Sequence, residues 1–269
     1  MKISVIIPTY KPQAYLWECL DSLVAQTFSK EDFEVVLVLN GCTEPWKSQI
    51  QEYIDTKMKG MNVKFIHTEQ GGVSNARNIA LDVAQGEYVT FIDDDDYVSK
   101  TFLASSYSIA DNETVVLCKP YAFEDGKPEV QRKYRITDSY YKLRHKGKIN
   151  HPRARKFFSG PWMKLIPMSF IQGRHFDTRF KNGEDSLFMF LISDRYKDVV
   201  FAEEDAVYFR RYRTGSAVTT SRSRKEIVSN EFRLLLTMLR IYIPRFWKYN
   251  FVFAMGNIMS TIHGMVECK

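Results

Sequence analysis

The chain has 269 residues, enough to bury a core in one large domain or in two small ones. With 45% hydrophobic and 26% charged residues, it has the composition of an ordinary globular protein. No apolar run reaches the roughly 18 residues that a membrane-spanning helix needs. The four cysteines form no C-x-x-C pair, which argues against a zinc site and favours a reducing cytoplasm, with Cys19 and Cys118 as buried thiols.

The first hundred residues alternate between strand and helix patterns. The apolar run that ends at Pro8 is too short for a signal peptide, so we interpret it as a first strand. Short apolar runs rich in β-branched residues predict four strands, at residues 3–7, 33–40, 63–67 and 87–92. Apolar residues at helical spacing predict helices between them, at residues 16–24, 50–58 and 74–84. This alternation predicts an α/β fold with a Rossmann-like, mostly parallel sheet flanked by helices.

Polar residues gather where the predicted strands end. Thr9 and Tyr10 follow the first strand, Asn40 ends the second, and the four aspartates at 93–96 follow the fourth. In parallel sheets, ligands bind beyond these carboxyl ends. Adjacent carboxylates repel one another, so the aspartates form either a solvated acidic turn or a site whose bound cation offsets the repulsion.

Two common ways of binding nucleotide phosphates are absent from the sequence. No G-x-G-x-x-G follows any of the predicted strands, and no P-loop pattern is present. A divalent metal on clustered carboxylates would hold phosphates by another route. The aspartates at 93–96 therefore become candidate metal ligands.

The second half of the chain has a different character. Residues 127–156 hold eleven Lys or Arg against two acids, about +9 in charge, which favours an anionic partner such as a phosphate, a nucleic acid or a membrane surface. Residues 199–212 are strand-like, and the segment from Ser216 to Arg224 is loop-like. Residues 225–269 are mostly helical, and Pro244 and Gly256 argue against one continuous helix.

Several segments in order resemble family 2 glycosyltransferases of the GT-A fold, of the bacterial polysaccharide and cell-surface glycan type. They are SVIIPTYKPQAYLWECLDSLVAQTF, FEVVLVLNG, GGVSNARNIALDVAQGEYVTFIDDDDYVS, SGPWMKLIP and FKNGEDSLFMF. The resemblance implies a glycosyltransferase domain at 1–220, with a nucleotide-binding half at 1–120 and an acceptor half at 121–220. A helical segment at 221–269 would pack on this domain or face a membrane.

The resemblance also implies how the aspartates work. Asp93-Asp94-Asp95 matches the family's DxD motif, and Asp96 follows it. Asp95 would bind Mg²⁺ or Mn²⁺ bridging the donor's diphosphate, with Asp93 and Asp96 also assigned to the metal. Asp93 would face the nucleoside or the ribose, and Asp94 is counted among the donor contacts.

The other donor contacts are carried over from the same resemblance. They are Pro8, Thr9, Tyr10, Asn40, Gly72, Arg77 and Arg211. The resemblance implies that one of Arg210, Arg211 and Arg213 binds the diphosphate, and the spacing to Ser216 favours Arg211. Ser74 would cap the helix that follows Gly72. The family usually has aspartates where this chain has Leu39-Asn40, which leaves the base open, although a UDP-sugar is favoured.

On the acceptor side, the resemblance places the general base at Asp185. The base takes a proton from the acceptor hydroxyl as it attacks the anomeric carbon. An acidic pair that favours a helix N-terminus is the alternative explanation for Glu184 and Asp185, and both can hold. Glu184, Trp162 and Lys164 are the expected acceptor-side residues.

We therefore predict an inverting, metal-dependent, hexosyltransferase-type glycosyltransferase. It would act in the cytoplasm or at the inner face of the membrane, on a glycan or lipid-linked acceptor. One alternative is a binding protein on the same scaffold that has lost turnover, which the Leu39-Asn40 departure favours. A basic nucleic-acid binder would explain the charge at 127–156 but leaves the aspartates unexplained, so we expect no nucleic-acid partner.

Overall fold

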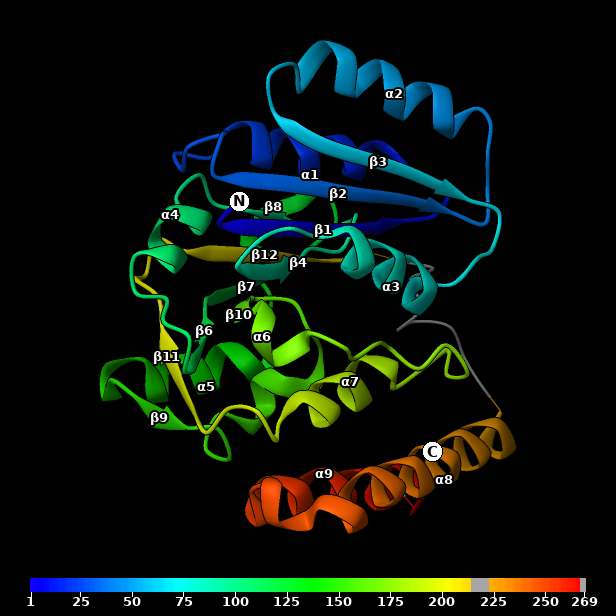
Figure 1. Cartoon of the computed structure of the whole chain (residues 1–269), viewed down its shortest axis with the longest axis vertical. Helices are drawn as coiled ribbons and strands as arrows, with labels where there is room; N and C mark the ends of the chain where they lie inside the picture. The colour runs from blue at the N-terminus through cyan, green and yellow to red at the C-terminus, as the bar shows by residue number, and fades with distance from the viewer. Residues whose placement is uncertain (214–222, 267–269) are drawn as a thin grey trace.

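A computed structural model of the chain describes residues 1–213 and 223–266. Within them, an eight-stranded sheet has the order β3-β2-β1-β4-β10-β6-β11-β9 (Figure 1). Its strands are β1 (Ile3–Thr9), β2 (Phe33–Asn40), β3 (Asn62–Thr68), β4 (Tyr88–Phe91), β6 (Thr114–Leu117), β9 (Ile149–Asn150), β10 (Lys164–Pro167) and β11 (Asp198–Phe201).

The four strands predicted in the first hundred residues form the parallel half of this sheet. β2 and β4 flank β1, and β3 lies at the edge, all parallel. The helices between them are α1 (Ala14–Val24), α2 (Trp46–Lys57) and α3 (Val73–Val83). In Figure 1, α3 lies in front of these strands and α1 behind them. Every residue of β1 and β2 is buried, which explains why their sequences are almost continuously apolar. The predicted α/β sheet is confirmed.

The second half extends the sheet and adds a smaller one. β10 runs antiparallel to β4, and it connects β4 to β6 and β11. The smaller sheet, in the order β5-β12-β7-β8, consists of β5 (Tyr97–Val98), β12 (Val207–Tyr212), β7 (Lys119–Glu124) and β8 (Lys127–Gln131). β12 is antiparallel to β5, which follows directly after the aspartates, so the end of β12 lies beside them.

Short helices connect the strands of this half, and they include residues 135–146 and 155–156 of the basic segment at 127–156. They are α4 (Phe102–Tyr107), α5 (Arg135–Leu143), η1 (Arg144–Lys146), η2 (Arg155–Ser159), α6 (Met168–Ile171) and α7 (Glu184–Ile192). Cys19 and Cys118 are both buried free thiols, as predicted.

The C-terminal residues form a helical hairpin of α8 (Arg224–Tyr242), η3 (Ile243–Lys248) and α9 (Phe251–Val266). α8 and α9 lie side by side, at the bottom of Figure 1. The expected break at Pro244 is confirmed, because α8 ends two residues before it. The prediction that these residues do not form one continuous helix is confirmed, although α9 itself continues through Gly256. A Cβ on Gly256 would lie 2.9 Å from Cδ of Arg155, so this glycine permits close packing.

The hairpin packs on the second half of the chain. Nη1 of Arg155 donates to the carbonyl oxygen of Gly256 over 3.0 Å, and Oη of Tyr249 donates to the carbonyl oxygen of Leu191 over 3.1 Å. Among the helices in the described ranges, 1–213 and 223–266, none combines the length and apolar character needed to cross a bilayer.

Candidate active site

A cleft of about 890 Å³ opens where β1, β2 and β4 end. The start of α7 and the end of β12 contribute to its wall. Fourteen of the residues predicted from the sequence line this cleft: Pro8, Thr9, Tyr10, Asn40, Gly72, Arg77, Asp93, Asp94, Asp95, Asp96, Trp162, Glu184, Asp185 and Arg211. Lys164 is the one predicted residue that does not line it.

The four aspartates form a tight turn that is held in place by the buried side chain of Asp96. The backbone N–H of Asp96 donates to the carbonyl oxygen of Asp93 over 3.0 Å and closes the turn. The side chain of Asp96 is buried and accepts hydrogen bonds from Oη of Tyr208 and from the backbone N–H of Arg211, each over 2.8 Å. Asp96 therefore fixes the turn, and both of its carboxylate oxygens are occupied.

Three carboxylates of the turn, Asp94, Asp95 and Asp96, have raised pKa values. Burial, together with the neighbouring carboxylates Asp95 and Asp93, raises the pKa of Asp94 to about 7, against a hydrogen bond from Thr9 and the charge of Arg213. Burial and the charge of Asp93 likewise raise the pKa of Asp95, although Nε of Arg213 contacts its Oδ2 at 2.7 Å. A raised carboxyl pKa means that the ionised form is disfavoured, here mainly by burial and then by the neighbouring carboxylates.

These carboxylates fit a divalent cation that arrives with a diphosphate. Among the residues that the structure describes, no three His, Cys, Asp or Glu side chains form a complete cage for a metal. Mg²⁺ is commonly held by only one or two carboxylates, with substrate phosphates and water as the other ligands. Asp93 and Asp95 can supply such carboxylates, whereas Asp96 is already engaged by Tyr208 and Arg211.

Arg77 joins the aspartate turn to the acidic pair at the start of α7. Its Nη2 contacts Oδ1 of Asp93 at 2.8 Å, and its Nη1 contacts Oδ1 of Asp185 at 2.6 Å. The guanidinium is almost fully buried and lies over the ring of Phe176, 5.3 Å from its centroid. We expected Arg77 to contact the nucleotide; the structure places it between two carboxylates, where it fixes their separation.

Asp185 has the properties of a base that works near neutral pH. It lies in the first turn of α7, and its side chain is 18% exposed. Burial raises its pKa to about 7; the charges of Glu184 and Asp93 add to this, and Arg77 opposes it. A carboxylate with a pKa near 7 accepts a proton more readily than an ordinary aspartate, and about half of it is still ionised at neutral pH.

Asn40 fastens the loops at the end of the sheet. Its Nδ2 donates to the carbonyl oxygen of Thr9 over 2.7 Å, and its Oδ1 accepts from the backbone N–H of Gly72 over 2.8 Å. Next to it, Gly41 has a φ of +67°, and a Cβ there would lie 2.9 Å from Cα of Gly71. Both features require glycine, so these loops meet too closely for a side chain. The departure at Asn40 therefore has a structural explanation.

The predicted cap at Ser74 is wrong. Gly72, with a φ of +127°, is the N-cap of α3, and Ser74 lies inside the helix. Its buried Oγ has no hydrogen-bond partner within the described part of the chain. The glycine takes the capping position because this positive φ is one that L-residues rarely adopt.

Trp162 and Lys164 lie at different depths. Trp162 lines the cleft and forms a parallel bridge with Phe91 at the end of β4. Lys164 is buried below it, and its Nζ donates to the carbonyl oxygens of Gly160 and Trp162, each over 2.8 Å. Burial lowers the pKa of Lys164 to about 7. Lys164 thus holds the Trp162 turn in place and does not reach the cleft as we expected.

The arginines of β12 separate onto two sides of the strand. Arg211 contacts Glu18 and Asp125, and its Nε donates to the carbonyl oxygen of Asp95 over 2.9 Å. Arg210 instead lies against Trp162. Arg210 and Arg213, the two alternatives to Arg211 as diphosphate ligand, also line the cleft. The alternation of side chains along a strand predicts that Arg210 and Arg211 point in different directions, but not which residues each of them contacts. Ser216, used for that choice, lies outside the described residues.

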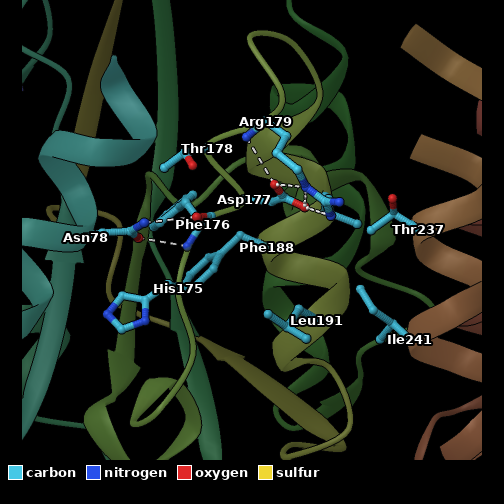
Figure 2. Close-up of a pocket in the computed structure, with 11 residues that line it drawn as sticks. Asn78, His175, Phe176, Asp177, Thr178, Arg179, Phe188, Leu191, Thr237 and Ile241 are labelled. Carbon is cyan, nitrogen blue, oxygen red and sulfur yellow. Dashed lines mark hydrogen bonds and ion pairs between the residues drawn. The ribbon is translucent and has the colours of Figure 1, made fainter. Parts of the chain in front are cut away.

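A second cavity, of about 530 Å³, is separate from the cleft and lies between α7 and α8 (Figure 2). Asn78 exchanges hydrogen bonds with the backbone of Phe176, over 2.9 and 2.8 Å, and Arg179 pairs with Asp177 at 2.6 Å. The pKa of Asp177 is lowered, mainly by the hydrogen bonds from Arg179. The carboxylates with raised pKa values line the first cleft, so we place the candidate active site there.

The fold and the cleft together indicate the class of protein. The parallel sheet has clustered aspartates at its carboxyl end, and the antiparallel strand β10 continues it toward the acidic pair Glu184 and Asp185. This arrangement resembles that of a GT-A glycosyltransferase. The family model described as Glycosyl transferase family 2 matches residues 4–173, and the chain belongs to this family.

Two relatives of the chain are bacterial proteins named as poly(ribitol-phosphate) transferases. It is 29% identical over 237 residues to the poly(ribitol-phosphate) beta-N-acetylglucosaminyltransferase TarS of Staphylococcus aureus, covering 87% of this chain and 40% of TarS. It is 27% identical over 224 residues to a poly(ribitol-phosphate) beta-glucosyltransferase of Bacillus spizizenii, covering 82% of this chain and 34% of that enzyme. The chain therefore spans less than half the length of these relatives.

The fold agrees with a solved structure of TarS. A crystal structure of a TarS fragment in complex with UDP-GlcNAc superposes with a TM-score of 0.70 at 27% identity, covering 89% of this chain and 67% of that fragment. The GT-A fold predicted from the sequence is confirmed.

Proposed function

We propose that this protein transfers a sugar from a UDP-sugar to an acceptor hydroxyl in one metal-assisted, inverting displacement. The observation that carries the proposal is the junction in the cleft, where Arg77 holds Asp93 of the aspartate turn and Asp185 of α7 in one ion-paired unit. The residue that binds the donor and the residue that activates the acceptor would then be held at a fixed separation. Positioning of this kind supplies much of enzymatic rate enhancement.

On the donor side, Asp93 and Asp95 would hold Mn²⁺ or Mg²⁺ with the diphosphate. The metal would offset the charge that develops on the departing UDP. Thr9 and Tyr10 would contact the base at the mouth of the cleft, where Tyr10 is 52% exposed. UDP is the preferred nucleotide because the similar TarS fragment was crystallised with UDP-GlcNAc. Asn40 would support this site indirectly, by holding the loop at Gly72.

On the acceptor side, Asp185 would remove the proton of the attacking hydroxyl. Its raised pKa, about 7, supports this role. General-base assistance typically contributes about 10²- to 10⁴-fold to the rate. Because a single attack occurs opposite the leaving group, the anomeric configuration would invert. Glu184 and Trp162 would border the acceptor.

The acceptor would be a glycan or lipid-linked polymer handled at the cytoplasmic face of a membrane. The names of both relatives describe transfer to a poly(ribitol-phosphate) polymer. Around η3, exposed aromatic and aliphatic residues alternate with Arg245 and Lys248. This composition fits an anionic lipid surface, on which the hairpin tip would rest.

The test is turnover of UDP-GlcNAc and UDP-glucose with Mn²⁺, measured as UDP release and as the anomeric configuration of the product by NMR. We expect Asp185→Asn to lower kcat about 10²-fold or more, because asparagine has the shape of aspartate but cannot act as the base. The matched control is Asp82→Asn, an exposed aspartate paired with His175 outside the cleft.

Three results would contradict the proposal. They are full activity of Asp185→Asn, retention of the anomeric configuration, and turnover that is unchanged by EDTA. The non-catalytic binding protein would regain support only if the wild type bound UDP with metal and turned over neither donor. Family membership and the pKa of Asp185 favour the enzyme.

A further inference from the structure

Arg210 is held in a frame of aromatic rings at the wall of the cleft. Its guanidinium carbon lies 5.0 Å from the ring centroid of Trp162, 5.2 Å from that of Tyr212 and 5.3 Å from that of Tyr134. Its Nη1 also donates to Oη of Tyr134 over 2.7 Å. Such contacts fix the direction of a guanidinium without neutralising its charge.

Arg210 differs in this respect from the other arginines of the cleft. Arg77 and Arg213 pair with aspartates that line the cleft, and Arg211 pairs with Glu18 and Asp125. Arg210 forms no ion pair with any residue in the described ranges. A half-buried, oriented cation with unused N–H donors is a ready site for an anion, because charge-assisted hydrogen bonds from a guanidinium are strong.

The position of Arg210 points to the acceptor and not to the donor. Arg211, its neighbour on β12, turns toward the aspartate turn, so Arg210 projects from the other face of the strand. There it contacts Tyr134, which precedes α5. The adjacent Lys133 and Arg135 are exposed. An anionic ligand bound at Arg210 would therefore extend toward the basic segment at 127–156.

We propose that Arg210 binds a phosphate group carried by the acceptor and thereby selects phosphate-bearing acceptors. This inference rests on the proposed function, because it requires a donor in the same cleft. A planar guanidinium matches two phosphate oxygens at once, and the rings of Trp162 and Tyr134 would keep it from turning away. With the phosphate fixed at Arg210, a hydroxyl of the same acceptor would be presented to Asp185, which lines the same cleft.

The experiment uses the whole chain loaded with UDP and Mn²⁺, and measures binding of two probes by calorimetry. The probes are ribitol 5-phosphate and ribitol, which differ only in the phosphate. In the wild type, we expect the phosphorylated probe to bind at least about tenfold more tightly. Arg210→Gln should reduce this ratio to near one, and Arg210→Lys should restore it in part because a lysine keeps the charge but not the planar fork.

The matched control is Arg179→Gln, which removes the same charge at the second cavity (Figure 2). It should leave the ratio unchanged, so a loss caused only by net charge is excluded. The Mn²⁺-dependent affinity for UDP is measured first in each variant. In Arg210→Gln it should stay within about threefold of wild type, since a larger loss means that Arg210 serves the donor diphosphate.

The outcomes separate this inference from the proposed function. If the wild type fails to bind UDP with Mn²⁺, the donor site is wrong and the inference falls with it. If UDP binds normally but both probes bind equally, or Arg210→Gln keeps the ratio, only the inference is overturned. A phosphate preference that depends on Arg210 and not on Arg179 supports it.

Discussion

At the scale of single residues, the cleft depends on a buried arginine between two carboxylates. Burying Arg77 costs desolvation energy, which its contacts with Asp93 and Asp185 offset. Removing one member of such a group leaves a buried charge unpaired, so Arg77 is a poor position for a clean test. Glu184 is a better one, because its charge raises the pKa of Asp185 and its replacement by glutamine preserves the shape.

We predict that Glu184→Gln shifts the acid limb of the kcat/KM profile to lower pH. The base must be ionised, so the activity of the wild type should fall as the pH drops through about 7. Loss of a neighbouring negative charge makes ionisation of Asp185 easier, so the limb moves down. The measurement is kcat/KM against pH, with Glu69→Gln at the rim of the same cleft as control. A shift to higher pH, or an equal shift in the control, would argue against Asp185 as the base.

At the scale of elements, the tip of the C-terminal hairpin is an exposed apolar surface. All residues of η3, from Ile243 to Lys248, are exposed, and Phe246 and Trp247 are more than half exposed. Phe251 and Val252, at the start of α9, extend this apolar tip. Exposed aromatic residues beside cations are typical of interfacial membrane segments. The packing of α8 and α9 leaves this tip pointing away from the core.

We predict that the protein sediments with vesicles of phosphatidylglycerol and phosphatidylcholine, but less with phosphatidylcholine alone. The double variant Phe246→Ser, Trp247→Ser should lower the partition coefficient about tenfold or more, because each buried aromatic contributes about 1.5–3 kcal/mol. The control is Phe232→Ser, an exposed aromatic of α8 outside the tip. Equal sedimentation of the tip variant and the wild type would show that the hairpin does not contact lipid.

At the scale of the whole molecule, the aspartate turn makes stability depend on pH and on metal. The pKa values of Asp94, Asp95 and Asp96 are raised in the fold, chiefly by burial. Groups of this kind favour the folded state at pH values below the unfolded pKa of about 4. That contribution is lost as the pH rises through their folded pKa, which for Asp94 is about 7. A bound divalent cation would restore it.

We predict that Mn²⁺ with UDP raises Tm more at about pH 8 than at about pH 6, because protons compete with the metal for the carboxylates. Asp95→Asn should reduce the increase at the higher pH, whereas Asp205→Asn, an exposed aspartate outside the cleft, should not. The measurement is thermal unfolding with Mn²⁺ and with EDTA. A Tm increase that does not depend on pH, or that persists in Asp95→Asn, would contradict the assignment of the metal to this turn.

The sequence by itself determined the parallel sheet and the position of the aspartates. Buried strands require continuous apolar runs and amphipathic helices require a regular spacing, so both appear in local patterns. The aspartates were placed in the same way, because they directly follow such a run. Asp185 was identified only through a family resemblance, and its place in the cleft agrees with it.

Only the tertiary structure decided which side chains meet. Arg77 and Asp185 are 108 positions apart, and no local pattern encodes their contact. Lys164 and Asn40 are polar residues in motifs that match the family. In the fold, however, Lys164 is buried below the cleft, and Asn40 holds two loops together by hydrogen bonds. Arg210 and Arg211 are equivalent in sequence, and the pairing of β12 beside the aspartate turn sent one to each side. Contacts between distant segments depend on how whole elements pack, so the charge environment of the cleft emerges only in the folded chain.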